Sequence, residues 1–290
     1  MPVPARWVMA SEAVVPVPAS VWIAIPLLAL LPPPVMLAAI AVFFFLLAVL
    51  VGGRAESTWV SLRWRARPLT AAEQAAMAPT IAVLCQQGIG PAAVDVYRTV
   101  SWPGWRARGT GRRSVVMTGD LLRGVRSGRL STGEAAALLA HACAAPLLGR
   151  TRWEGPLLLG LLPWALGRLL LLTLWTVAAP LQGMVLLGWK VRFVYVIVGI
   201  IQVWPQARWL ATLVFLIAAA TYWHPAAVRA VTRLRQREGD TFTVQHQLGP
   251  HLVCVLNRTS RGDALLERVH GIQTQIAATA GPAPVPRVDA

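Results

Sequence analysis

Long apolar stretches alternate with arginine-rich polar stretches along the chain. Residues 35–51 carry no polar side chain, and as a helix at ~1.5 Å per residue they would reach roughly 26 Å, enough for a thin bilayer core. The preceding stretch, 14–31, is also apolar but contains prolines, and three further prolines at 32–34 separate the two. This pattern predicts a transmembrane hairpin over residues 1–53, which we interpret as an anchor and not as a cleaved signal peptide.

A second apolar region covers residues 156–224. Its clearest pieces are 157–179 and 209–223, whereas 193–204 is a shorter piece flanked by basic side chains and suits a short span, a re-entrant segment or an interfacial helix. Arg168 is expected to face protein or water, because a lipid-facing charge costs ~2.5–3.5 kcal/mol. Together with the hairpin, this region predicts about four transmembrane helices.

Two helix-start signals occur in the polar region that follows the hairpin. A serine or threonine three residues before a glutamate forms a capping box, and the two boxes are Thr70 with Glu73 and Ser131 with Glu134. They predict helices over residues 70–86, disturbed at Pro79, and over 132–145, ending before Pro146.

Two short stretches alternate as β-strands do. They are residues 94–100 (VDVYRTV) and 114–118 (SVVMT), and we expect them to pair across a turn that contains Gly109 and Gly111. Residues 120–125 begin a short helix. The polar parts therefore predict a small, mostly helical domain with a short sheet.

Composition and charge indicate a membrane protein with cytoplasmic polar regions. Hydrophobic residues make up 56% of the chain and charged residues 13%, which is too apolar for a water-soluble domain of this size. Arginines outnumber acids in both polar regions, so we expect both on the cytoplasmic side of a plasma or inner membrane. The net charge of +15 is explained mainly by this topology; attraction to anionic headgroups follows, and nucleic acid is the less favoured partner.

Three motifs, in order, resemble the HtpX-like membrane zinc metallopeptidases. They are VVMTGDLL (115–122), LSTGEAAALLAHACAAPLLGR (130–150) and RLRQREGDTFTVQHQLG (233–249). The second is similar to the family's metal-binding helix, and the third to its later R-E-x-x-A-D-x-F segment. The resemblance covers roughly residues 20–260. It implies an α+β protein, with a polytopic helical membrane part and a small cytosolic metallopeptidase-like domain.

The same resemblance implies that the zinc site is degenerate. In the family, two histidines four residues apart and a later glutamate bind zinc, and the glutamate after the first histidine is the general base. Here the first ligand position is His141, but the base position is Ala142, the second ligand position is Ala145 and the third is Gln236. One imidazole supplies only a small part of the ~10–16 kcal/mol with which structural zinc is held. No cofactor is therefore expected, and zinc would be present only if the chain is active after all.

Other residues near these positions allow several interpretations. His246 and His251 are candidate substitute ligands, whereas Cys143 should lie about 200° around the helix from His141. His141 itself is a structural histidine, a hydrogen-bonding group in a retained cleft, or a ligand. Asp240 matches the family's outer-shell aspartate, and either pairs with His141 or an arginine or is solvated.

These observations predict the following division of the chain: an N-terminal transmembrane hairpin (1–53), a basic cytosolic segment with the peptidase-like helix at 131–147 (54–155), a second transmembrane region (156–224), C-terminal cytosolic helices that complete the domain (225–278) and a disordered tail (279–290). The favoured hypothesis is an inactive peptidase relative that binds an unknown protein as a regulator or scaffold. The alternatives are a membrane metalloendopeptidase with a non-standard site, and a basic membrane protein that docks nucleic acid or anionic lipid.

Overall fold

The computed structural model describes residues 31–89, 94–162, 207–259 and 262–279, with a few isolated positions in 20–24 and 194–205. The chain divides into two compact units. One consists of Met1–Leu47 with Pro156–Leu234, and the other of Ala48–Gly155 with Arg235–Ala290. The sheet and the candidate site lie in the second unit.

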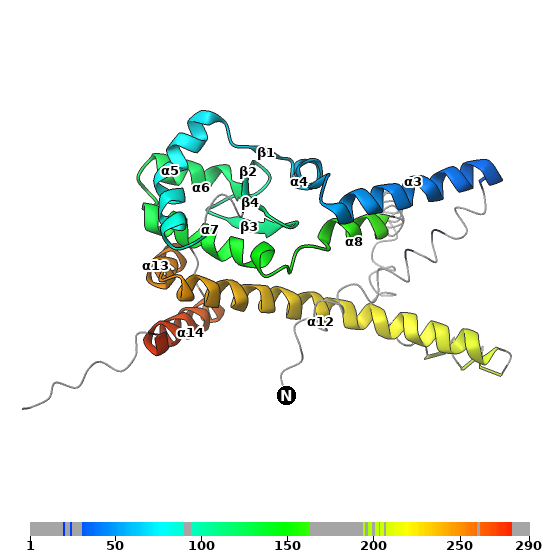
Figure 1. The fold of residues 1–290 in the computed structure, drawn as a ribbon. Helices are drawn as coiled ribbons and strands as arrows, with labels where there is room; N and C mark the ends of the chain where they lie inside the picture. Colours follow the sequence, from blue (N-terminus) through cyan, green and yellow to red (C-terminus); the bar gives the residue numbers. More distant parts are fainter. Residues whose placement is uncertain are drawn as a thin grey trace, which may run out of the picture. The chain divides into compact units, whose positions relative to one another are not determined.

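A small mixed sheet lies at the centre of the second unit (Figure 1). Its strand order is β1-β2-β4-β3, and the strands are β1 (Ala66–Pro68), β2 (Asp95–Thr99), β3 (Ala107–Thr110) and β4 (Ser114–Thr118). The predicted strands at 94–100 and 114–118 are thus present and adjacent. They run parallel and not as a hairpin, because the chain between them forms a strand of its own, β3, which pairs antiparallel with β4.

The other described elements are helices. They are α3 (Pro33–Gly52), α4 (Glu56–Trp64), α5 (Ala71–Gln86), α6 (Gly119–Arg126), α7 (Thr132–Leu147), α8 (Glu154–Gly160), α12 (Arg208–Gln245), α13 (Gly249–Thr259) and α14 (Asp263–Thr279). Both predicted capping boxes form, at the starts of α5 and α7. Both helices also continue through their internal prolines, so the predicted end of α7 before Pro146 is wrong by two residues.

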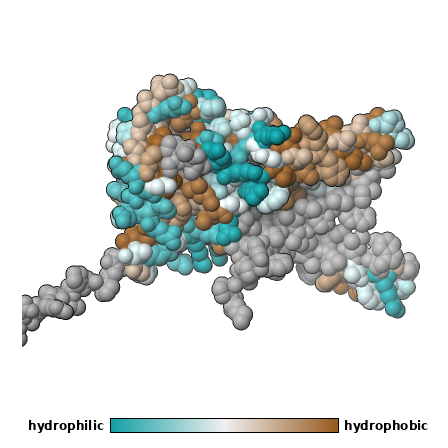
Figure 2. Space-filling model, viewed as in Figure 1, coloured by the Kyte–Doolittle hydropathy of each residue, from teal (hydrophilic) through white to brown (hydrophobic). Residues whose placement is uncertain are grey.

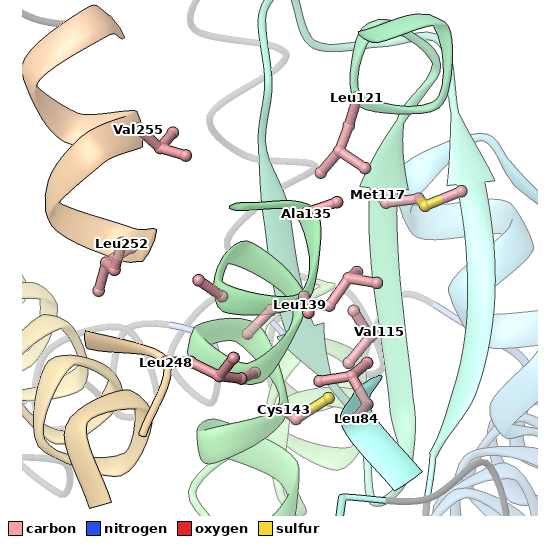
Figure 3. Packing of buried hydrophobic residues seen from close by; sticks show 14 of the residues in the cluster. Leu84, Val115, Met117, Leu121, Ala135, Leu139, Cys143, Leu248, Leu252 and Val255 are labelled. Carbon is pink, nitrogen blue, oxygen red and sulfur yellow. The ribbon is translucent and has the colours of Figure 1, made fainter. Parts of the chain in front are cut away.

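The two faces of the sheet bury different side chains, because alternate residues of a strand point to opposite sides. Val115 and Met117 join a large core with α5, α6, α7, α13 and α14, part of which is shown in Figure 3. Val116 faces the other way, into a smaller cluster with Val60 of α4 and Tyr97 of β2. All five residues of β4 are buried, so this strand joins the two cores.

The prediction of about four transmembrane helices is wrong. In the described part of the chain only α3 is both long and apolar enough to cross a membrane, and its surface is brown in Figure 2. One such helix near the N-terminus suits a span or a signal sequence equally. The apolar stretch 209–223 belongs to α12, a 38-residue helix that continues into an arginine-rich second half. The predicted spans at 14–31 and 157–179 and the predicted disordered tail fall mostly outside the described residues, and the predicted piece at 193–204 is described only at scattered positions.

Helix α7 and strand β3 approach each other closely at Gly109. Pro146 has no N–H to give to the carbonyl of Ala142, four residues earlier in α7. A Cβ atom on Gly109 would lie 2.3 Å from that carbonyl oxygen and 2.3 Å from Pro146 Cδ. The proline therefore leaves a backbone carbonyl without its helical partner, and only a residue without a side chain can bring β3 against it. This contact places β3 beside the helix that carries His141.

Candidate functional site

Three helices bring the predicted site residues together. His141 projects from the middle of α7, Gln236 and Asp240 are one turn apart on α12, and Arg268 comes from the second turn of α14. Asp240 is buried, whereas His141 and Arg268 keep 24% and 20% of their side-chain surface exposed. We call His141, Gln236, Asp240 and Arg268 the central cluster.

The guanidinium of Arg268 is the centre of this cluster. It donates to both carboxylate oxygens of Asp240, from Nη2 to Oδ1 at 2.6 Å and from Nε to Oδ2 at 2.9 Å. His141 Nε2 lies 3.2 Å from Asp240 Oδ1 and 3.2 Å from Arg268 Nη2. Nε2 carries either a proton for the carboxylate or a lone pair for the guanidinium, so it hydrogen-bonds only one of the two at a time.

The α12 side of the cluster is completed by Gln236 and Gly239. With its amide oxygen turned toward Arg268, Gln236 accepts from Nη1 at 3.0 Å and from Nε at 2.9 Å. A Cβ atom at Gly239 would lie 2.6 Å from His141 Nε2. The imidazole therefore lies directly on the backbone of α12, where an alanine would strike it.

The electrostatics of Asp240 follow from these contacts. Burial alone would raise the pKa of its carboxyl group, but hydrogen bonds from His141 and Arg268 and the charge of Arg268 outweigh that effect, and the pKa lies below its ordinary value. Asp240 is therefore an ionised carboxylate near neutral pH. The sequence left open whether Asp240 is paired or solvated. In the structure it is paired with His141 and with an arginine, Arg268.

The other positions on α7 offer no chemistry to the cluster. Ala142 is buried, and its carbonyl faces Gly109. Ala145 has only a methyl side chain. Cys143 lies in the large core beside Leu84, Val115 and Leu248, as Figure 3 shows, and burial raises the pKa of its thiol to about 12. It is a neutral packing residue on a different face of the helix from His141, as the helical repeat predicts.

The candidate substitute ligands have other contacts. His246 Nδ1 lies 2.8 Å from the carbonyl oxygen of Phe242, and its ring packs on the Phe242 ring. The ring of His251 lies against Gly133 at the start of α7. Glu238, the carboxylate nearest to Gln236 along α12, is paired with Arg150 at 2.6 Å. In the ranges that the structure describes, no three His, Cys, Asp or Glu side chains are grouped so as to hold a metal ion.

The residues of the central cluster do not fit a zinc ion. Zinc in proteins takes three or four nitrogen, sulfur or carboxylate ligands, whereas here a guanidinium already contacts the imidazole, the amide and the carboxylate. A divalent cation placed among them would be repelled by that fixed positive charge. The cluster is a cation–carboxylate clamp that joins α7, α12 and α14.

An open groove of about 810 Å³ lies beside the central cluster. One wall is the segment Trp102–Arg108 that leads into β3, the other is the face of α13 from Leu252 to Thr259, and His141 and Arg268 border it. We call this the β3 groove. The wall before β3 is held by Thr118, whose hydroxyl donates to the carbonyl of Gly104 at 2.7 Å and accepts from the amide of Arg106 at 3.2 Å.

Sequence reasoning missed Arg268 and the tryptophans of the groove. Nothing in the local sequence of α14 sets Arg268 apart from the arginines that are exposed elsewhere in the chain. The available signal was indirect: Asp240, matched to the family's outer-shell position, needs a cation or a hydrogen-bond donor when it is buried. The tryptophans Trp64, Trp102 and Trp105 were not predicted as site residues, but all three line the groove.

Comparison of the chain with protein-family models, with curated proteins and with solved structures finds no match. The resemblance to the HtpX-like peptidases therefore remains a prediction from three sequence motifs. The geometry of the central cluster and of the β3 groove is independent of it.

Proposed function

We propose that this protein is a membrane-attached, non-catalytic binding protein that holds polypeptide segments in the β3 groove. The observation that carries the proposal is the position of Arg268. Its guanidinium contacts His141, Gln236 and Asp240 together, so the groups that border the groove are tied to one another. A site whose polar groups are mutually satisfied suits binding better than proton transfer or metal activation of water.

The absence of a carboxylate base at the position after His141 on α7 supports the same interpretation. A hydrolase needs a group that takes a proton from water and a second group that stabilises the developing charge. The position after His141 is an alanine, and Asp240, whose pKa is held low, is already bound by two donors. The acid beside Gln236 on α12, Glu238, is engaged with Arg150.

The edge of the sheet supports polypeptide as the ligand. β3 is the last strand of the sheet, and in the described ranges no strand pairs with its other side. An extended segment can bind such an edge through main-chain hydrogen bonds while its side chains enter pockets beside it. The β3 groove lies along this segment and is lined partly by apolar residues of α7 and α13, including Leu138, Leu252 and Val255.

Helix α3 supports attachment to a membrane. None of its side chains is buried and none is charged, and an exposed apolar helix of 20 residues is long enough for a bilayer core. A large exposed apolar surface of this kind marks a membrane or protein contact in a folded protein.

The proposal is tested with the full-length protein in detergent and fluorescently labelled unfolded casein. We expect a complex by fluorescence anisotropy and no shorter casein fragments after prolonged incubation with added zinc. Thr259 is exposed and lines the groove, so Thr259→Trp should fill it and weaken binding. Thr274 is exposed on α14, outside the groove lining, and makes the same hydrogen bond to the carbonyl four residues earlier, so Thr274→Trp is the matched control.

The opposite results are equally clear. Chelator-sensitive cleavage of casein that disappears in a His141→Ala variant would overturn the non-catalytic interpretation. Equal binding by the Thr259→Trp and Thr274→Trp variants would remove the groove as the binding site.

A further inference from the structure

The lining of the β3 groove has an uneven charge. It contains four arginines, one histidine and no aspartate or glutamate. The acids nearest to three of these arginines, Glu134, Glu154 and Asp240, are not part of the lining, and their side chains are only 6%, 14% and 7% exposed. The lining therefore holds arginines and no carboxylates, although Arg258 and Arg268 are each paired with a buried acid.

Two of these arginines retain hydrogen-bond donors for a ligand. Arg106 is exposed, and within the described residues its side chain has no acidic partner. Arg108 is 47% exposed, and its nearest acid, Glu154, lies 3.7 Å away, beyond hydrogen-bond range. A planar guanidinium with free donors is well matched to a carboxylate, which it can bind with two parallel hydrogen bonds.

The spacing of these two arginines matches an extended ligand. Arg106 and Arg108 are two residues apart where the chain enters β3. The carbonyl of Arg106 accepts from the amide of Thr118 at 3.0 Å, so the hydrogen bonds between β3 and β4 continue back to Arg106. Residues two apart in a strand project to the same side. They would therefore meet two side chains of an extended ligand that are also two residues apart.

Aromatic rings complete the binding surface. Trp64 packs edge-on against Trp102 at a centroid distance of 4.9 Å, and the guanidinium of Arg108 lies over Trp64 at 4.9 Å. Farther along the groove, the guanidinium of Arg258 lies over Trp105 at 5.1 Å. Stacking holds these cations in place before a ligand arrives, which lowers the entropy lost on binding. The rings also offer apolar surface for the residues between the acids.

We propose that the β3 groove selects an extended acidic polypeptide segment in which two carboxylates are separated by one apolar residue. This inference rests on the proposed function and adds the chemistry of the partner. The carboxylates bind Arg106 and Arg108, the apolar residues lie against the tryptophans, and the main chain follows the edge of β3. A nucleic-acid strand also carries negative charge and stacks on tryptophan, but it has no main chain that can extend a β-sheet.

The experiment uses three fluorescein-labelled twelve-residue peptides and the full-length protein in detergent. The peptides alternate leucine with glutamate, glutamine or lysine. We expect the glutamate peptide to bind about tenfold more tightly than the glutamine peptide and the lysine peptide to bind most weakly, since two exposed ion pairs together are worth roughly 1–1.5 kcal/mol. The Arg106→Gln, Arg108→Gln double variant should remove this preference. Arg126, an exposed arginine outside the groove lining, gives the control Arg126→Gln, which should retain it.

Other outcomes of this experiment would contradict the acidic preference, the proposed function or the class of ligand. Equal binding of the glutamate and glutamine peptides would overturn the acidic preference and leave the proposed function standing, whereas no binding of any peptide would count against both. Tighter binding of an oligothymidylate that is lost in the same double variant would assign the groove to nucleic acid. An Arg106→Lys variant keeps the charge but loses the paired donors, so it should bind the glutamate peptide more tightly than Arg106→Gln and less tightly than the unchanged protein.

Discussion

Two buried carboxylates in this protein are held in nearly the same way. Glu73, at the start of α5, accepts from Arg67 through both oxygens, at 2.8 Å each, and from Arg98 as a second cation. Asp240, on α12, accepts from Arg268 through both oxygens and lies beside His141. In both, charge-assisted hydrogen bonds outweigh burial and lower the pKa of the carboxyl group.

The two clamps differ in how far apart their residues lie in the sequence. Arg67 is six residues from Glu73, which also closes the capping box with Thr70. His141 and Arg268 are 127 residues apart, and Asp240 lies between them in the chain. The first clamp holds one helix start, and the second holds three helices together. The likeness supports the interpretation that the central cluster is a structural clamp beside a binding groove.

The largest expected effect comes from turning the second clamp into a metal site. Ala145→His and Gln236→Glu add two ligands to His141, but Arg268 still contacts that centre. At 4 Å and an effective dielectric of 20, two unit charges repel by about 4 kcal/mol, so the guanidinium repels a doubly charged zinc ion by about 8 kcal/mol. We expect the triple variant that also carries Arg268→Ala to bind one zinc per chain, at least about a thousandfold more tightly than the double variant that keeps Arg268.

Isothermal titration calorimetry and zinc analysis of the purified proteins measure this difference. Equal zinc affinity with and without Arg268 would show that the guanidinium does not block the centre. Failure of both variants to bind zinc would contradict the alignment of Ala145 and Gln236 with ligand positions.

Removing the arginine of each clamp should cost different amounts of stability. Arg268→Ala leaves a buried carboxylate with only His141 and should lower the free energy of unfolding by about 3 kcal/mol. Arg67 is 49% exposed, and Arg98 would remain beside Glu73, so Arg67→Ala should cost about 1 kcal/mol or less. Denaturant unfolding followed by circular dichroism gives both values. A smaller loss for Arg268→Ala than for Arg67→Ala would contradict the proposed role of the second clamp.

Acid should weaken the first clamp over a defined pH range. The hydrogen bond from Arg67, against the opposing effect of burial, lowers the pKa of Glu73 from 4.5 to about 2. The carboxylate therefore contributes stability that is fully present above pH 4.5 and is lost as the pH falls toward 2, by about 1–2 kcal/mol after solvent screening. Glu73→Gln should remove this part of the pH dependence. Glu267 is exposed, and Glu267→Gln should leave the curve unchanged in thermal melts between pH 2 and 6.

The smallest effect concerns the backbone beneath His141. An alanine inside an exposed helix is normally favoured over glycine by up to ~1 kcal/mol, and Gly271 of α14, with nothing within 4 Å of the added Cβ, should show that gain. At Gly239 the added Cβ would lie 2.6 Å from His141 Nε2, so Gly239→Ala should lose about 1 kcal/mol instead. Unfolding curves of the two variants should therefore shift in opposite directions.

The features that were predicted correctly are those that depend on residues close together in the sequence. Both capping boxes and the alternating strands β2 and β4 are where their local patterns indicate. The predicted hairpin between β2 and β4 was wrong. These two strands run parallel because the chain between them forms a further strand, β3, which pairs antiparallel with β4. Glu56 illustrates the same limit. Its carboxylate accepts from the amides of Arg112 and Arg113 and from the hydroxyl of Ser114, at 2.9, 3.0 and 2.6 Å, across a separation that no local pattern encodes.

Three of the four residues of the central cluster were predictable, and the fourth was missed for a similar reason. His141, Gln236 and Asp240 were identified from motif positions, and they do meet. Arg268 lies at the centre of the cluster but was not predicted. The sequence around an arginine on a polar helix looks the same whether its side chain faces solvent or a buried aspartate. The four-span prediction failed because hydrophobicity counted over a window does not separate a membrane helix from the apolar half of a longer one such as α12.

The origin of Arg268 in the last described helix has a consequence for biosynthesis. The ribosome synthesises His141 well before α14, and domains generally begin to fold while the chain is still growing. Until residue 268 emerges, the aspartate has no guanidinium partner, and its burial among α7 and α12 is unfavourable. We therefore expect a chain truncated before α14 to leave Asp240 unpaired and this region less protected from proteolysis than in the full-length protein.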